Sequence, residues 1–190
     1  MKLTRVRALR GPNLWSRHTA IECIVESEPA AHANAGMAAL EAAVRRLFPA
    51  LWPLRSGVRP PIYGKPHLLE AVALALQAQA GCPVTFSRTA ATADPGIYQV
   101  VVQYSEEAVG RLALELAQQL IEAAGRGEGC DVAGAIARLR ELDEDERLGP
   151  STGCIVAAAA ARGIPAPRLT RGRLVRLGWG RRQRKIWAAE

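Results

Sequence analysis

The order of hydrophobic and polar residues along the chain predicts two strands at its start. Residues 3–9 alternate apolar and basic side chains, although the period is imperfect, and a turn follows at Gly11-Pro12-Asn13. Residues 20–25 place Ile21, Cys23 and Val25 on one side. A period of two is typical of strands with one buried face.

Apolar residues at helical spacing then predict helices over residues 37–51 and 67–80, with Gly81 at the C-terminal end of the second. Strands are expected at 83–88 and 97–104, joined by a turn at 94–96. Ser105 is predicted to cap a helix running to about residue 124, and Asp131 a helix that ends in the acidic run 141–146. An alanine-rich helix follows from Gly149 to near residue 163.

Past residue 163 the pattern predicts two short strands, 173–177 and 184–188, around the turn Gly178-Trp179-Gly180. The expected fold class is therefore α+β. It consists of a mixed or antiparallel sheet with about five helices packed on it, followed by a short basic β segment. A domain boundary is predicted near residue 162, giving domains 1–162 and 163–190.

The charge of the chain is unevenly placed. The net charge is +7, and residues 161–190 contain nine of the 25 Lys and Arg residues but one of the 18 acidic residues. Trp179 and Trp187 lie among these arginines, a pattern that also fits a nucleic-acid surface. A basic nucleic-acid-binding protein is kept as an outside alternative, and nucleic acid is not the expected partner.

The cysteines and the apolar runs indicate the compartment. The four cysteines, Cys23, Cys82, Cys130 and Cys154, are at least 24 residues apart, which excludes a CxxC motif and predicts four buried, reduced thiols. No signal-peptide pattern begins the chain, and the longest apolar run has eight residues, far below the ~20 needed to cross a bilayer. We expect a cytoplasmic protein with no membrane contact.

Several stretches, in order along nearly the whole chain, resemble the amino-terminal region of cyanophycin synthetases. The matching stretches are Leu9-Arg10-Gly11-Pro12-Asn13 with Trp15, Val72-Ala73-Leu74 with Leu76-Gln77 and Ala80-Gly81, Arg88-Thr89 with Pro95-Gly96-Ile97-Tyr98, Glu107-Ala108-Val109-Gly110-Arg111, Leu148-Gly149-Pro150-Ser151-Thr152, and Leu177-Gly178-Trp179-Gly180 with Gln183-Arg184-Lys185-Ile186. One such stretch would mean little, but the ordered set is fairly specific.

The resemblance implies a three-part ligase that makes a polymer with an aspartate backbone bearing arginine side chains. Its amino-terminal domain precedes an ATP-grasp domain and a Mur-ligase-like domain. On this basis residues 163–190 are the first strands of a truncated ATP-grasp domain, and the ligase domains are absent. ATP and Mg would belong to those missing domains, so no cofactor and no ligase activity are expected. The sequence also has no GxxxxGK[ST] loop.

The resemblance further implies that such a domain can carry a zinc-binding His-x-x-Glu-His helix that cuts the polymer and supplies primers. Here residues 67–71 read His-Leu-Leu-Glu-Ala, so the second histidine is missing. We interpret His67 and Glu70 as remnants and expect neither a bound metal nor a catalytic residue. The simpler interpretation makes His67 an ordinary helix-start residue and Glu70 a solvated one. A zinc-dependent endo-hydrolase remains the alternative.

Arg10, Asn13 and Trp15 follow the first predicted strand and are candidate polymer contacts. A cation suits carboxylates, and an aromatic face suits guanidinium groups. In the structural alternative Asn13 makes the turn and Trp15 packs. The leading hypothesis is a non-catalytic module that binds and tethers cyanophycin. Its partners would be the polymer and ligase domains in cis or a cyanophycin synthetase in trans, and a homo-oligomer is left open.

Overall fold

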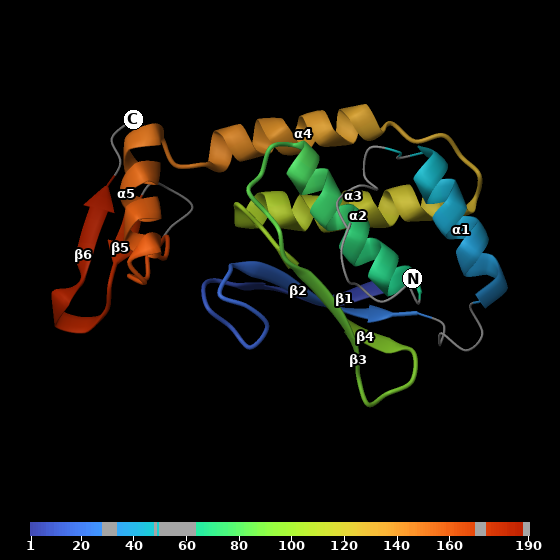
Figure 1. Ribbon diagram of the computed structural model, residues 1–190, viewed down its shortest axis with the longest axis horizontal. Coiled ribbons are helices and arrows are strands. Elements are labelled where there is room, and N and C mark those ends of the chain that lie inside the picture. The colour runs from blue at the N-terminus through green and yellow to red at the C-terminus, as the bar shows by residue number, and fades with distance from the viewer. Residues whose placement is uncertain (28–33, 48, 50–63, 170–173, 188–190) are drawn as a thin grey trace. The chain divides into compact units, whose positions relative to one another are not determined.

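The computed structural model describes residues 1–27, 34–47, 49, 64–169 and 174–187 (Figure 1). The chain divides into two compact units, Met1–Asp145 and Glu146–Glu190. The described residues form five α-helices and two antiparallel sheets, which confirms the predicted α+β class. The predicted domain boundary near residue 162 stays a prediction.

The first unit is built on a four-stranded antiparallel sheet. Its strands are β1 (Lys2–Leu9), β2 (Ala20–Glu26), β3 (Ser87–Ala91) and β4 (Ile97–Gln103), in the order β1-β2-β4-β3. The side chains of Ile21, Cys23 and Val25 are all buried on one face, as their alternation predicts.

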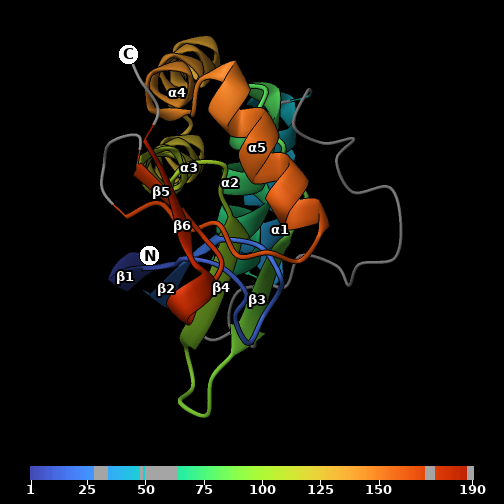
Figure 2. The same ribbon diagram turned by 90° about the vertical axis from the view of Figure 1, so that its left-hand side faces the viewer.

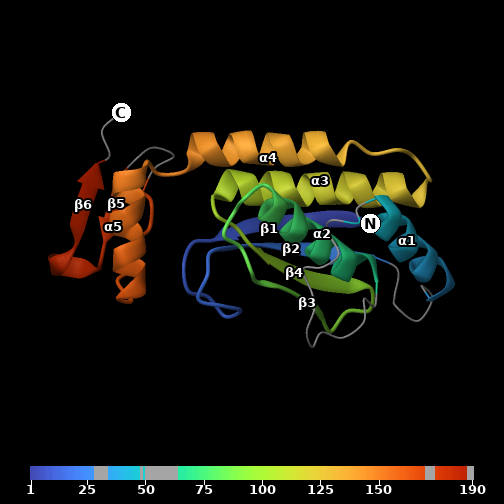
Figure 3. The ribbon, with the colours of Figure 1, turned by 45° about the horizontal axis from the view of Figure 1, so that its top comes forward.

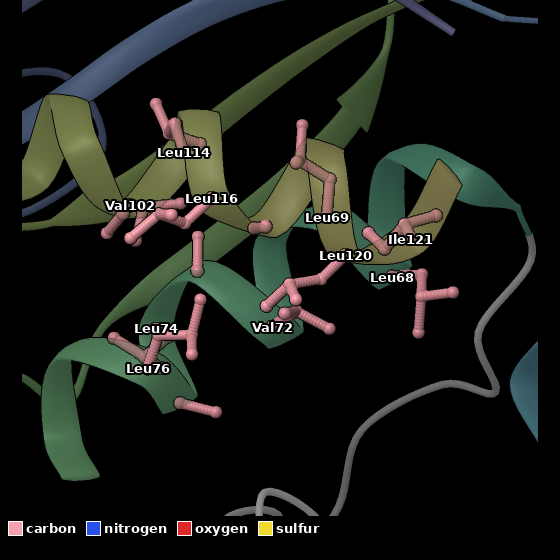
Figure 4. Packing of buried hydrophobic residues seen from close by; sticks show 14 of the residues in the cluster. Leu68, Leu69, Val72, Leu74, Leu76, Val102, Leu114, Leu116, Leu120 and Ile121 are labelled. Carbon is pink, nitrogen blue, oxygen red and sulfur yellow. The ribbon is translucent and has the colours of Figure 1, made fainter. Parts of the chain in front are cut away.

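Four helices of this unit lie on that side of the sheet (Figures 2 and 3). They are α1 (Asn34–Leu47), α2 (Lys65–Gln79), α3 (Glu107–Gly125) and α4 (Val132–Glu146), with α2 and α3 packed directly against the strands. Helix α2 is the central one, with ten of its fifteen residues buried, as an apolar sequence on all sides requires. Figure 4 shows Leu68, Leu69 and Val72 of α2 packed among Leu114, Leu116, Leu120 and Ile121 of α3. The opposite face of the sheet, hereafter the open face, carries none of the described helices of this unit.

Helix α3 approaches the sheet closely because it has a glycine at the contact. A Cβ atom at Gly110 would lie 2.6 Å from Cβ of Tyr104 and 3.0 Å from Cγ1 of Ile21. Both distances are shorter than van der Waals contact, so a larger residue would push α3 away from β2. The absence of a side chain at Gly110 therefore sets the spacing between helix and sheet.

Helix α4 begins as predicted, with a side-chain oxygen of Asp131 accepting a hydrogen bond from the backbone N–H of Gly134 at 2.8 Å. The prediction for Ser105 was wrong, because α3 starts at Glu107 after Glu106. The Ser105 hydroxyl instead donates to the carboxylate of Asp143 at 2.6 Å. Ser105 therefore fastens α4 to the start of α3.

The predicted strand 83–88 was placed too early, since β3 begins at Ser87. The backbone N–H groups of Thr85 and Phe86 both donate to the side-chain oxygen of Gln103, each at 2.9 Å. The side chain of Gln103 thus accepts the backbone hydrogen bonds that the main chain of a neighbouring strand would otherwise accept. The first predicted helix is also shifted: it starts at Asn34 and ends at Leu47, and the end predicted at residue 51 lies outside the described residues.

The thiols differ in exposure. Cys23 and Cys82 are buried, Cys130 is half-buried and Cys154 is exposed, so the expectation of four buried thiols was wrong for the last two. Burial raises the pKa of Cys23 to about 12 and that of Cys82 to about 11. Both buried thiols are therefore protonated at neutral pH and are poor nucleophiles.

The second unit contains α5 (Pro150–Ala161), β5 (Leu174–Leu177), the short 3-10 helix η3 (Gly180–Arg182) and β6 (Arg184–Trp187). Strands β5 and β6 pair as an antiparallel hairpin, as predicted. Helix α5 begins after Gly149, also as predicted. In the part of the chain that the structure describes, every helix is too short or too polar to cross a membrane.

Candidate functional site

Four residues, one from each strand, form a line across the open face. The pairing register places Arg7 of β1 opposite Glu22 of β2, Glu22 opposite Val101 of β4, and Val101 opposite Arg88 of β3. Residues directly opposite in neighbouring strands point to the same face of a sheet. We call these four residues the open-face row: Arg7, Glu22, Val101 and Arg88.

A β-bulge decides that Arg7 belongs to this row. Between the pairs Thr4–Ile24 and Arg7–Glu22, β1 advances by three residues while β2 advances by two. The extra residue lies where Arg5 has a positive φ of 51°. Without it, Arg7 would point toward the helices, because side chains alternate along a strand. This bulge explains why the alternation of residues 3–9 is imperfect.

Glu22 is the buried centre of the row, with an exposed fraction of 3%. Its carboxylate accepts hydrogen bonds from Nε of Arg7, from the amide of Gln99 and, at 3.2 Å, from the indole Nε1 of Trp15. Burial alone would raise the pKa of this carboxyl, but its three donors outweigh burial and hold the pKa below its ordinary value. Glu22 is therefore an anion that fixes its neighbours in place.

Trp15 is carried to the open face by the loop between β1 and β2. The Asn13 side chain braces this loop: its oxygen accepts from the backbone N–H groups of Trp15 and Ser16 at 2.9 and 3.0 Å. Its amide also donates to the carbonyl oxygens of Gly11 and His18. Asn13 thus makes the turn, as the structural alternative predicted, and its bonds within the loop hold Trp15 in position.

The ring of Trp15 lies against Arg88 of the open-face row. The guanidinium carbon of Arg88 is 5.5 Å from the ring centroid, within cation–π range. The Arg88 side chain is exposed, and Trp15 is half-buried. The loop and three strands together therefore place one indole ring beside the guanidinium group of Arg88 and on the same carboxylate, Glu22, that binds Arg7.

Arg10 has a different location from Trp15 and Asn13. Its guanidinium donates to the carboxylate of Glu107, at the start of α3, at 2.9 Å. Arg111 bonds the same carboxylate, and the two arginines hold the pKa of Glu107 below its ordinary value against the opposing effect of burial. Among the three sequence candidates, the structure brings Trp15 to the open-face row, with Asn13 bracing its loop, and pairs Arg10 with α3.

Sequence reasoning missed Arg7 and Arg88. Both were visible as basic residues in or beside predicted strands, but their face depends on the bulge in β1 and on the true start of β3. The same reasoning missed Glu22. A single acidic residue in an apolar strand does not indicate which hydrogen-bond donors the folded chain will place around it.

The remnant motif on α2 lies on the other face of the sheet. Glu70 was expected in solvent under the simpler interpretation, which was wrong, because its exposed fraction is 2% and Ser87 of β3 donates to it at 3.1 Å. His67 lies in the first turn of α2, with its ring edge-on to Tyr98 at 6.3 Å. Among the described residues no group of three or more His, Cys, Asp or Glu side chains is placed to hold a metal ion.

The second unit has a separate basic and aromatic surface on its hairpin. Trp179 and Trp187 are 63% and 77% exposed, and the guanidinium carbon of Arg176 lies 4.9 Å from the ring centroid of Trp179. Arg181, Arg182 and Arg184 are exposed beside them. This hairpin is the element on which the nucleic-acid alternative depends.

Comparison with known proteins identifies the family. Residues 64–125, which span α2, β3, β4 and α3, match the model of the Cyanophycin synthase-like N-terminal domain. Over these residues the chain is similar to the N-terminal domain of cyanophycin synthases. This confirms the family that the sequence motifs indicated.

Cyanophycin synthetases are similar to the chain over nearly all of its length. The chain is 36% identical to cyanophycin synthetase of Trichormus variabilis over 206 aligned residues, and 35% identical to that of Geminocystis herdmanii over 205 residues, each covering 99% of this chain. The enzyme of Crocosphaera subtropica is 39% identical over 125 residues. The chain spans 22% of the length of the Trichormus variabilis enzyme, so the activity of the whole synthetase does not transfer to it directly.

Proposed function

We propose that this chain binds cyanophycin, the polymer that names its relatives, and holds it without cutting it. The single observation that carries the proposal is the open-face row with Trp15. The indole ring lies beside the exposed guanidinium group of Arg88 and donates to the same buried carboxylate, Glu22, that binds the exposed guanidinium group of Arg7. The similarity to cyanophycin synthetases supports cyanophycin as the ligand in this proposal.

The chemistry of the row suits a polymer of aspartate and arginine. Guanidinium groups bind carboxylates with paired hydrogen bonds, and an indole face attracts the guanidinium groups of the polymer. Neither contact requires the polymer to adopt one fixed sequence register. A repetitive polymer could therefore engage the row at any of its repeats.

Tethering follows from such binding when ligase domains are close by. A polymer held on the open face stays at a high effective concentration near a second site on the same assembly. The partners in this proposal are the polymer and the ligase domains of a cyanophycin synthetase, joined in cis or recruited in trans.

The proposal is tested by incubating the purified chain with insoluble cyanophycin and measuring both the protein retained in the pellet and the length of the polymer. We expect retention of the protein and an unchanged polymer length. Soluble fragments whose release stops on addition of a chelator would instead support the zinc-dependent hydrolase. A chain that stays in the supernatant at low salt would contradict binding.

A further inference from the structure

We propose that the open-face row recognises the carboxylates of its ligand, so that it binds acidic chains more tightly than basic ones. This inference rests on the proposed binding function and adds which polymer groups the site holds. It is drawn from how the charges of the row are already used within the fold.

The acid of the row, Glu22, is not available to a ligand. Its exposed fraction is 3%, and both of its oxygens accept hydrogen bonds, Oε1 from Trp15 and Gln99 and Oε2 from Arg7. A guanidinium group of the ligand would have to displace an internal donor to reach it. The row therefore presents no open carboxylate to a cationic ligand.

The cations of the row remain accessible. The side chain of Arg7 is 68% exposed, and its bond to Glu22 uses Nε, the nitrogen nearest the chain. The two terminal nitrogens therefore remain as a pair of donors for a second carboxylate. Arg88 is also exposed, and its guanidinium carbon lies 5.5 Å from the centroid of the Trp15 ring. Both cations are held in place before a ligand arrives.

The distance between these cations favours a chain over a single amino acid. Arg7 and Arg88 lie on the two outer strands, three strand spacings apart, which is about 14 Å between backbones. An extended peptide covers that distance in about four residues. A short acid reaches one guanidinium group at a time, whereas an acidic polymer can engage both and gains from the second contact.

The test measures binding of polyaspartate, free aspartate, polyarginine and a single-stranded DNA oligonucleotide to the full chain by calorimetry at fixed ionic strength. We expect polyaspartate to bind, free aspartate to bind at least about ten-fold more weakly, and polyarginine also to bind more weakly than polyaspartate. Polyarginine binding as tightly as polyaspartate would overturn the proposal. Oligonucleotide binding that matches polyaspartate and depends on Arg7 and Arg88 would also overturn it, because the row would then recognise negative charge in general.

Substitutions test whether polyaspartate binds at the open-face row. The charge-removing substitutions Arg7→Gln and Arg88→Gln should each weaken polyaspartate binding about three- to ten-fold. The matched control is Arg126→Gln, which removes an exposed guanidinium group that is also paired with a carboxylate, that of Glu128 at 2.7 Å. Equal losses in the control and in the row variants would contradict the proposal, and circular dichroism of each variant checks that the fold is intact.

The inference and the proposed function fail in different ways. Retention on cyanophycin that polyaspartate does not displace would overturn carboxylate recognition while leaving polymer binding in place. Polyaspartate binding without any retention on cyanophycin would overturn the proposed function while leaving the chemistry of the row in place.

Discussion

At the scale of single residues, Glu22 organises the candidate site although both of its oxygens are occupied by internal donors. Its carboxylate gathers an arginine from β1, an amide from β4 and an indole from the loop before β2. A buried carboxylate is costly unless it is hydrogen-bonded, so each donor both stabilises the anion and is itself oriented. The hydrogen bonds that position the binding groups therefore also stabilise the sheet.

The lowered pKa of Glu22 predicts a loss of stability in acid. Because the folded pKa lies below the unfolded one, the stabilisation is present above the unfolded pKa and is lost as pH falls through the folded value. The Glu22→Gln variant should be destabilised by about 1–3 kcal/mol at neutral pH and should lose less stability than the wild type on acidification. Urea unfolding at neutral pH and below pH ~4 measures both effects.

Glu107 also contributes to the loss of stability in acid. Its pKa is also lowered, by Arg10 and Arg111 against burial, so the wild-type loss in acid is shared between two carboxyls. The Glu22→Gln variant should therefore retain part of the acid sensitivity. A variant whose acid sensitivity equals that of the wild type would show that Glu22 contributes none of it.

Trp15 depends on Asn13 for its position, which gives a second prediction. Replacing Asn13 by Ala removes four hydrogen bonds that hold the loop, while Trp15, Arg7 and Arg88 stay in the sequence. We expect polymer binding to weaken with little change in the melting temperature, because the loop lies outside the core. Retention on cyanophycin compared between Asn13→Ala and the neighbouring Leu14→Ala, whose side chain is fully exposed, measures this effect. Unchanged retention of Asn13→Ala would contradict the bracing role.

At the scale of elements, the contact between α3 and β2 is the most sensitive to substitution. Alanine at Gly110 would favour the helix by about 1 kcal/mol, but its Cβ would lie 2.6 Å from Tyr104. Overpacking of this kind costs about 1–3 kcal/mol, so the net effect is destabilising. The melting temperature of Gly110→Ala should fall relative to Gly129→Ala, where a Cβ meets no atom within 4 Å. A melting temperature at or above that of the control would contradict the close packing of α3.

The elements also show what a single sequence can predict. The faces of β2 and the buried character of α2 follow from local pattern, since Ile21, Cys23 and Val25 alternate and the residues of α2 are apolar on all sides. The bulge in β1 and the start of β3 do not follow from local pattern. The bulge depends on the register of β1 with β2, and the start of β3 depends on the side chain of Gln103, and these partners are distant in the sequence. The candidate site combines these long-range events, so that Trp15 was found from sequence while Arg7, Glu22 and Arg88 were not.

The remnant motif illustrates the same limit at one residue. The sequence shows that Ala71 replaces the second histidine of the implied zinc helix, but it cannot show that Ser87 lies under Glu70. Once α2 packs on the sheet, the carboxylate of Glu70 is a buried acceptor. Its burial comes from the pairing of β3 with β4, which no local pattern reveals.

At the scale of the whole molecule, binding is assigned to the first unit although the net charge lies mainly in the second. Removing charge from the hairpin by Arg181→Gln, Arg182→Gln and Arg184→Gln together should leave cyanophycin retention nearly unchanged. The same triple variant should lose any weak binding to nucleic acid, since that binding depends on positive charge. Loss of cyanophycin retention in the triple variant would place the polymer on the second unit instead.

The most direct test of the account compares two tryptophans, one from each unit. Retention on insoluble cyanophycin is measured for Trp15→Ala, which removes the ring beside Arg88 and the donor to Glu22, and for Trp179→Ala, which removes the exposed ring beside Arg176. We predict that Trp15→Ala weakens retention by about five-fold or more, while Trp179→Ala binds like the wild type. Equal retention of Trp15→Ala and wild type would contradict the claim that the open face holds the polymer.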